Sequence, residues 1–282
     1  MKDARQTLIV LDDARFGRAL VFEGPAEVIR CDHASEAETA LARLDAAVAA
    51  GRHAAGFMAY ELGYALEPRL APLMPEALPA PLLWFALFRE PQILEGGALT
   101  AFLQRRVRGG HRLSGVRLLM DRTVYASRFD RVRRHIAAGD VYQINLTFPL
   151  AFECAGDPLS LWCALRARQP VAHGGFIGTE DFSLLSLSPE LFIKAGNGVL
   201  TSRPMKGTAA REPGENDQAA AGRLHRDAKS RAENLMIVDL IRNDIARVTQ
   251  PGSVRVPELY TVETYPGFFG MTSTVTGRLR EG

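Results

Sequence analysis

Lys206 is the residue of this chain whose type and setting are best suited to chemistry. Of the 34 basic residues among 282, only four are lysines: Lys2, Lys194, Lys206 and Lys229. Arginine stays protonated, whereas a desolvated lysine amine can lose its proton and attack a carbon atom. Lys206 ends an apolar predicted strand and precedes Gly207 and Thr208. It is therefore a candidate nucleophile, although its spacing alone favours a solvated lysine at a strand end.

Two glutamates are candidates for acid–base or metal chemistry. Glu190 follows a Ser-Pro pair at the start of a predicted strand, where an ordinary edge-strand charge is the alternative. Glu233 lies in a predicted helix above an apolar stripe, where a carboxylate needs a cationic partner or a metal ion. Lys229, four residues earlier, is a suitable partner. Asp244 lies about 16 Å further along the helix, at ~1.5 Å per residue, so it cannot share one ion with Glu233.

The predicted elements place these candidates in the second half of the chain. Hydrophobic spacing predicts an amphipathic helix over residues 127–138, with Phe129, Val132 and Ile136 on one side. Further predicted helices cover residues 35–50, 159–168 and 217–248, and predicted strands cover residues 54–60, 81–88, 141–150, 182–187, 191–194 and 199–205. Glycine pairs precede the second half. We therefore expect an N-terminal subdomain over residues 1–112 and a second domain over residues 113–282.

Composition and charge exclude several classes of protein. A hydrophobic content of 47% is enough for a large core, and a net charge of +2 with dispersed arginines gives no nucleic-acid footprint. Three cysteines without CxxC spacing indicate a reducing compartment, and no histidine pair has the spacing of a helical metal site. The first residues have no long apolar region behind them, so we expect no signal peptide, and the longest apolar run, residues 82–88, is too short to span a membrane. We therefore expect a soluble, cytoplasmic protein.

Five motifs follow one another in the second half of the chain. They are GDVYQINLT from Gly139, SPELF from Ser188, RPMKGTAAR from Arg203, RAENLMIVDLIRND from Arg231 and TSTV from Thr272. In this order they closely resemble the chorismate-binding enzymes, a family that includes anthranilate, isochorismate, salicylate and aminodeoxychorismate synthases. The resemblance is strong over residues 120–279, and the AENLMIVDLIRND string is its most specific part. It implies an α+β, anthranilate-synthase-like fold of two face-packed β-sheets with helices outside.

The resemblance also implies a role for each candidate residue. Glu190 would protonate the departing C4 hydroxyl of chorismate, and Glu233 would bind Mg²⁺, which holds the ring carboxylate of chorismate. Gly207 would let the backbone approach the substrate closely, and Thr208 would offer a hydroxyl and an N–H group. Lys206 lies in a PMKGT segment, which is similar to the PIKGT of aminodeoxychorismate synthases and differs from the PIAGT of anthranilate synthases.

The implied reaction is the conversion of chorismate and ammonia to 4-amino-4-deoxychorismate. The Lys206 amine would add at C2 of chorismate while the C4 hydroxyl leaves, and ammonia would then add at C4 and expel the lysine. A glutamine amidotransferase is the implied partner that supplies the ammonia. Residues 11–13 and 57–64 also resemble bacterial members of this branch of the family. Two alternatives stay open: an anthranilate synthase, and a non-catalytic fragment that binds chorismate.

The chain departs from the family pattern at three places. Ser230 occupies the position of a second helical acid, which weakens the expected ion site, and Gly270 occupies the position of a histidine found in many relatives. Relatives also continue with a glycine-rich segment, a carboxylate-binding Tyr and Arg and a second Mg²⁺-binding glutamate, and none of these precedes Gly282. We therefore expect the fold to be incomplete at its C-terminus and this chain alone to be inactive.

Overall fold

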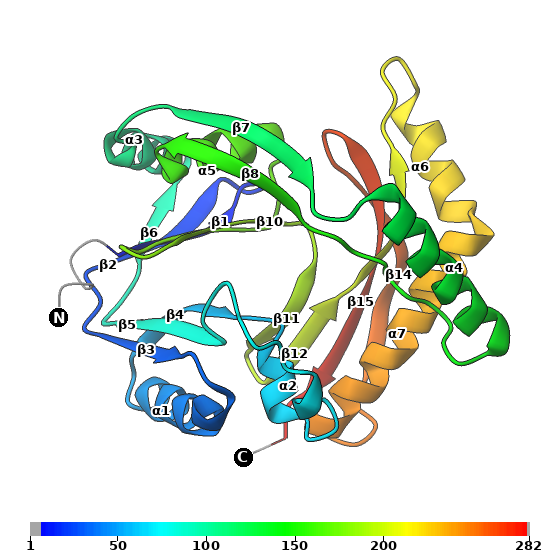
Figure 1. The fold of residues 1–282 in the computed structure, drawn as a ribbon, viewed down its shortest axis with the longest axis horizontal. Coiled ribbons are helices and arrows are strands. Elements are labelled where there is room, and N and C mark those ends of the chain that lie inside the picture. Colours follow the sequence, from blue (N-terminus) through cyan, green and yellow to red (C-terminus); the bar gives the residue numbers. More distant parts are fainter. Residues whose placement is uncertain (1–6, 281–282) are drawn as a thin grey trace. The chain divides into compact units, whose positions relative to one another are not determined.

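The computed structural model describes residues 7–280, which form antiparallel β-sheets covered by α-helices (Figure 1). Contacts along the chain divide it into two compact units. The first unit contains the described residues up to 106 together with residues 165–189, and the second contains residues 107–164 and those from 190 onward. This mixture of helices and sheets confirms the α+β class. The domain boundary expected between residues 112 and 113 stays a prediction.

The first unit contains two antiparallel sheets. Its five-stranded sheet has the order β10-β9-β1-β2-β6, and its three-stranded sheet has the order β3-β5-β4. The strands are β1 (Leu8–Asp13), β2 (Arg18–Glu23), β3 (Glu27–Cys31), β4 (His53–Met58), β5 (Leu83–Phe88), β6 (Gln92–Glu95), β9 (His173–Gly178) and β10 (Ser183–Ser188). The helices of this unit are α1 (Ala37–Ala49), α2 (Leu62–Leu66) and α3 (Gly96–Arg106).

Apolar side chains from both sheets form the core of the first unit. Residues at alternate positions of a strand point to one face, so each sheet presents one apolar face to the other. The largest core residues are at most 4% exposed: Ile9, Phe22, Trp84, Phe88 and Ile177. The rings of Phe22 and Phe88 lie 5.1 Å apart. The other face of the three-stranded sheet packs on α1 (Figure 1), which confirms the helix predicted over residues 35–50.

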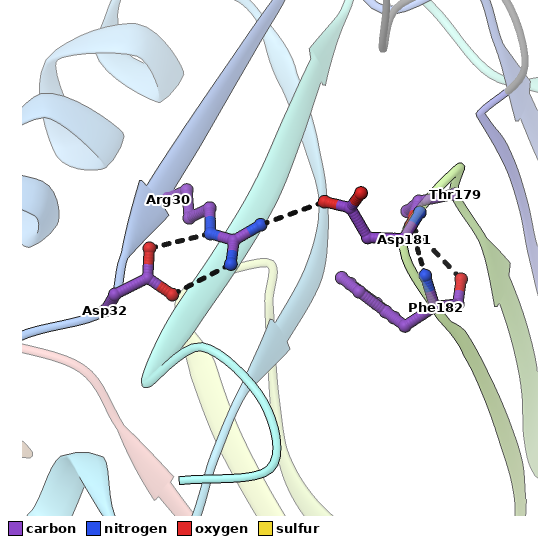
Figure 2. A network of polar contacts seen from close by, with 5 residues as sticks. All are labelled: Arg30, Asp32, Thr179, Asp181 and Phe182. Carbon is purple, nitrogen blue, oxygen red and sulfur yellow. Dashed lines mark hydrogen bonds and ion pairs between the residues drawn. The ribbon is translucent and has the colours of Figure 1, made fainter. Parts of the chain in front are cut away.

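A network of ion pairs joins β3 to the turn between β9 and β10 (Figure 2). Arg30 donates from Nε and Nη2 to the two Asp32 carboxylate oxygens, at 2.7 and 3.0 Å, and from Nη1 to Asp181 at 3.2 Å. The Thr179 hydroxyl accepts the N–H groups of Asp181 and Phe182, which holds the turn in place. The Arg30 side chain is 42% exposed, so these ion pairs contribute little to stability and chiefly fix the position of the turn.

Asp12 and Arg166 form a buried ion pair in the first unit. The Arg166 guanidinium donates from Nε to Asp12 Oδ2 at 2.6 Å and from Nη2 to Oδ1 at 3.0 Å, and the Asp12 side chain is 1% exposed. Burial raises the pKa of the Asp12 carboxyl, while the hydrogen bonds and charge of Arg166 lower it. The ionised carboxylate therefore depends on Arg166 to offset the free energy of its desolvation.

We expect Arg166→Met to lower the free energy of unfolding by about 3 kcal/mol near neutral pH, because it leaves a buried carboxylate without its partner. Without Arg166 the pKa of Asp12 rises further, so the folded state binds a proton more tightly than the unfolded state. The variant should then regain stability as the pH falls toward the unfolded carboxyl value of about 4. Urea unfolding at several pH values measures this. The control is Arg168→Met at an exposed position, and a loss of equal size at every pH would contradict the account.

The second unit is built on a five-stranded sheet with the order β11-β12-β15-β13, to which β14 adds by pairing with β15. The strands are β11 (Leu191–Gly196), β12 (Val199–Arg203), β13 (Met205–Ala210), β14 (Arg255–Thr264) and β15 (Phe268–Arg278). A separate two-stranded sheet contains β7 (His111–Leu118) and β8 (Leu150–Gly156), and the helices are α4 (Arg122–Ala138), α6 (Asp217–Arg226) and α7 (Ala228–Val248). Helix α5 (Pro158–Arg168) crosses the division, with residues 158–164 in the second unit and residues 165–168 in the first. None of the helices in the described part of the chain is long and apolar enough to cross a lipid bilayer.

Helices α6 and α7 cover the five-stranded sheet of the second unit (Figure 1). Leu224 of α6 packs with Phe269 and Met271 of β15, and Val238 of α7 packs with Val275 further along the same strand. The three β15 residues have odd numbers, so they point to the same face of the sheet. The sheet therefore holds α7 against β13 and β15, and this is the arrangement on which the candidate site depends.

One helix and one strand predicted in the second unit differ from the structure. The helix predicted over residues 217–248 is divided at Asp227, whose backbone is extended and whose carboxylate accepts the Ser230 N–H at 2.7 Å. Asp227 thus caps α7, and hydrogen bonds from Ser230 lower the pKa of this carboxyl. The strand predicted over residues 141–150 is absent, since residues 141–149 join no ladder among the described strands and β8 begins only at Leu150.

Candidate active site

Glu190 and Lys206 form the centre of the candidate site. Glu190 lies directly before β11, and Lys206 is the second residue of β13. Glu190 Oε1 accepts the Met205 N–H at 2.8 Å and a proton of Lys206 Nζ at 3.4 Å. Lys206 Nζ also donates to the Met205 carbonyl at 2.9 Å. The Lys206 side chain is 31% exposed and the Glu190 side chain is 39% exposed, so the pair is partly shielded from solvent and still accessible to a ligand.

A distortion of β13 brings the Lys206 backbone close to α7. The pairing of β13 with β15 shifts register between Met205 and Thr208, so the ladder is interrupted at Lys206 and Gly207. Gly207 has φ 90°, a conformation that strongly favours glycine, and a Cβ there would lie 2.6 Å from Ser230 Cβ. The glycine after the lysine is therefore required by the approach of strand to helix.

A cavity of about 1070 Å³ opens beside this pair. Its wall comes from four places in the second unit: the irregular segment 141–145, Glu190 directly before β11, the start of β13, and the middle of α7. The α7 residues that line it are Met236, Ile237, Asp239, Leu240 and Asn243. A cavity of this size, with an apolar wall and a few polar groups, suits a small organic ligand.

The structure brings three of the five predicted site residues together. Glu190, Lys206 and Gly207 line the cavity. Thr208 is exposed on β13, opposite Gly270 of β15, and Glu233 lies on α7; neither is among the described residues that line the cavity. The roles assigned to all five residues stay predictions.

Glu233 has the ion-pair partner that its spacing allows. Its Oε1 lies 3.6 Å from Lys229 Nζ, and its side chain is 28% exposed. No group of three or more His, Cys, Asp or Glu side chains within residues 7–280 is placed to hold a metal ion. Mg²⁺ uses few protein carboxylates and keeps several waters, so the partly exposed Glu233 carboxylate is a chemically suitable ligand for it. Mg²⁺ binding by Glu233 stays a prediction.

Two clusters of buried polar groups in the second unit were not predicted from the sequence. Asn234 is 1% exposed on α7, and its amide contacts backbone carbonyls of β13 and β15 as well as the hydroxyl of Ser273. A second cluster surrounds Glu263, whose carboxylate accepts from Tyr265 at 3.1 Å and Thr272 at 2.9 Å, with Arg203 Nη2 at 3.1 Å. The one available signal was an asparagine within the apolar pattern of a helix.

Gly270 has a structural explanation in this chain. A Cβ at this position would lie 2.7 Å from Met205 Sδ and 2.9 Å from Met205 Cε. The thioether of Met205 thus occupies the space that a larger residue at position 270 would need. A histidine at this position requires Met205 to move, so the two residues are matched to each other.

Comparisons with known proteins agree with this geometry. A sequence model described as chorismate binding enzyme matches residues 6–282. The chain is 42% identical over 168 residues to aminodeoxychorismate synthase component 1 of Klebsiella aerogenes, covering 59% of this chain and 37% of that protein. It is 41% identical over 162 residues to anthranilate synthase component 1 of Streptomyces coelicolor, covering 56% of this chain and 31% of that protein. The chain therefore spans about a third of the length of these curated relatives.

Solved structures confirm the predicted anthranilate-synthase-like fold. Anthranilate synthase component I of Streptococcus pneumoniae has a TM-score of 0.68 at 22% identity, covering 82% of this chain and 58% of that chain. The menaquinone-specific isochorismate synthase of Escherichia coli has a TM-score of 0.65 at 15% identity, covering 99% of this chain and 66% of that chain. At these identities the likeness establishes the fold alone.

Proposed function

The chain belongs to the family of chorismate-binding enzymes, and from this premise we propose that it carries the chorismate-converting site of an aminodeoxychorismate synthase. In this proposal chorismate and ammonia give 4-amino-4-deoxychorismate, an intermediate on the route to p-aminobenzoate and folate. Two bacterial relatives with that name share 42% identity with the chain over more than half of its length, which supports the choice among the branches of the family.

The observation that carries the proposal is the contact between Lys206 and Glu190 at the cavity wall. An amine and a carboxylate 3.4 Å apart provide a nucleophile and an acid in one place. A proton that passes from Lys206 Nζ to Glu190 leaves a neutral amine and a protonated carboxyl, the two forms that the reaction needs. An alanine at position 206 would offer neither the amine nor the proton.

The proposed reaction has two steps, in which Lys206 is first bound and then released. The Lys206 nitrogen forms a bond to C2 of chorismate, both ring double bonds shift by one position, and the C4–O bond breaks as Glu190 gives its proton to the hydroxyl, which leaves as water. Ammonia then forms a bond to C4, both double bonds shift back, and the C2–N bond to Lys206 breaks. A proton from the new C4 ammonium group returns to Glu190, so the pair regains its starting state.

Two further components belong to the proposal. Mg²⁺ would be held by Glu233 and would neutralise the ring carboxylate of chorismate. Ammonia would come from a glutamine amidotransferase partner, which agrees with the word component in the names of the relatives.

Product analysis tests the proposed function. The protein is incubated with chorismate, ammonium and Mg²⁺, and the products are identified by mass spectrometry. We expect 4-amino-4-deoxychorismate as the main product. Anthranilate as the main product would overturn the assignment, and no conversion would favour a chorismate-binding role without catalysis.

We expect Glu233→Gln to raise the Mg²⁺ concentration needed for half-maximal turnover by about tenfold or more, because one anionic oxygen ligand is lost. Lys229→Ala is the matched control, since it removes the same helix ion pair and leaves the carboxylate in place. Turnover measured over a series of Mg²⁺ concentrations gives the answer. Equal behaviour of the two variants would mean that Glu233 is only an ion-pair partner.

A further inference from the structure

Asn234 is a buried amide that connects α7 to two strands. It is 1% exposed, and its side-chain nitrogen donates to the Met271 carbonyl of β15 at 3.1 Å and to the Lys206 carbonyl of β13 at 3.4 Å. Its side-chain oxygen accepts the Ser273 hydroxyl proton at 2.5 Å. Both ends of the amide are therefore used, as a buried polar group requires.

The Asn234 amide contacts the Lys206 carbonyl at the point where the pairing of β13 with β15 is interrupted. The register shift between Met205 and Thr208 interrupts the ladder at the lysine and at Gly207. There the strand is held by contacts with α7, through the Asn234 amide and the close approach of Gly207 to Ser230. The position of the Lys206 peptide, and with it the direction of its side chain toward Glu190, therefore depends on α7.

The same network contains a backbone conformation that is costly to form. Tyr260 has φ 61°, an uncommon conformation for a non-glycine residue, and it lies at an irregularity in the pairing of β14 with β15. Its N–H group donates to the Ser273 hydroxyl at 3.0 Å. His225 Nδ1 lies 2.9 Å from its carbonyl, and the Arg231 guanidinium lies 4.2 Å from the centre of its ring. A strained residue persists only where its surroundings hold it firmly. Here Tyr260 is held by these contacts, and its N–H group in turn holds the Ser273 hydroxyl that bonds to Asn234.

We propose that Asn234, fixed by Ser273, is a positioning residue that sets the orientation of the Lys206 amine toward Glu190. This inference rests on the proposed function for its catalytic meaning, since it concerns the geometry of the same pair. It does not require Asn234 to touch the substrate, and Asn234 is not among the described residues that line the cavity. Without the amide, the Lys206 peptide moves within the distorted strand and the amine loses its alignment with Glu190.

Competitive labelling of lysines on the full chain tests this directly. A limiting amount of an amine-acylating reagent is added at several pH values, and mass spectrometry gives the ratio of Lys206 to Lys229 modification. Lys229 is the internal reference, because its side chain is 82% exposed. Asn234→Ala should raise the ratio, because the amine is released from Glu190. We expect a change of about threefold or more, which corresponds to the low end of the free energy of one hydrogen bond. Ser273→Ala should shift it in the same direction by a smaller factor.

Thr249→Val is the matched control for a purely structural effect. Thr249 is also buried, and its hydroxyl donates to the Ile245 carbonyl of α7 at 2.8 Å, near the C-terminal end of that helix. It should lower the melting temperature and leave the labelling ratio within experimental error. If Asn234→Ala and Ser273→Ala lower the melting temperature without changing the ratio, or if Thr249→Val changes it equally, the positioning role is overturned. The ratio needs no turnover, so this result is independent of the product analysis.

Discussion

Lys206→Ala is expected to abolish C4 amination, with a loss in turnover of at least about 1,000-fold and little change in chorismate binding. The amine is the atom that bonds to C2 in the proposed reaction, and no second lysine is present among the described residues that line the cavity. In the proposed site chorismate would also contact the other residues of the cavity wall, so the dissociation constant should change only slightly. Turnover and equilibrium binding measured on the same preparation separate the two effects.

Three further lysine variants make this experiment specific. Lys206→Arg keeps the positive charge and removes the nucleophile, so it should be as inactive as the alanine variant. Lys194→Ala and Lys229→Ala remove exposed lysines and should retain near-normal turnover. Substantial activity in Lys206→Arg would mean that the site needs only a cation at this position, and covalent catalysis would then be excluded.

The central pair of the site could be predicted from the sequence because each residue lies in a short, distinctive motif. Lys206 precedes a glycine, and the structure shows why: the strand approaches Ser230 too closely for any Cβ at Gly207. The ion pair of Glu233 with Lys229 also follows from spacing alone, since residues four apart on a helix are neighbours. Motif and helical period are local properties, and they are retained in the folded chain.

The supporting network could not be predicted, because its contacts join residues far apart in the sequence. Asn234 reaches a carbonyl 28 residues earlier and a hydroxyl 39 residues later, and neither partner is marked by any local pattern. The strand predicted over residues 141–150 is wrong for a related reason. Its alternation suits a ladder, but residues 141–145 line the cavity and pair with no described strand. Tertiary contacts determine both the Asn234 network and the irregular conformation of residues 141–149.

Several large apolar side chains of α4, β7 and β8 are exposed. The sequence predicts an amphipathic helix with one apolar side, yet α4 buries none of its residues, and Phe129 and Ile136 are 43% and 42% exposed. Strands β7 and β8, which pair with each other, also expose large apolar side chains: Val116, Leu118, Leu150 and Phe152, at 65, 60, 57 and 49%. We call these four residues of β7 and β8 the apolar patch. A group of exposed apolar residues of this kind marks an interaction surface or a site of aggregation.

The 282-residue chain should therefore self-associate and bind the dye ANS at micromolar concentrations. Replacing Val116, Leu118 and Phe152 by threonine keeps the strand propensity of β7 and β8 and removes three apolar contacts. At about 1 kcal/mol for each half-exposed side chain, the three changes should weaken self-association by roughly 100-fold. Sedimentation velocity over a range of protein concentrations measures the association constant.

Two exposed apolar residues of the first unit provide the matched control. Phe16 is 81% exposed and Ile93 of β6 is 52% exposed, and they lie outside the apolar patch. Phe16→Thr and Ile93→Thr should leave both self-association and ANS binding unchanged, because isolated exposed apolar side chains are normal on protein surfaces. If the chain stays monomeric without binding ANS, the patch is covered in solution. If the control pair has the same effect as the patch variant, general surface hydrophobicity would explain the association. Only a loss confined to the patch variant identifies β7 and β8 as the surface through which the chain associates.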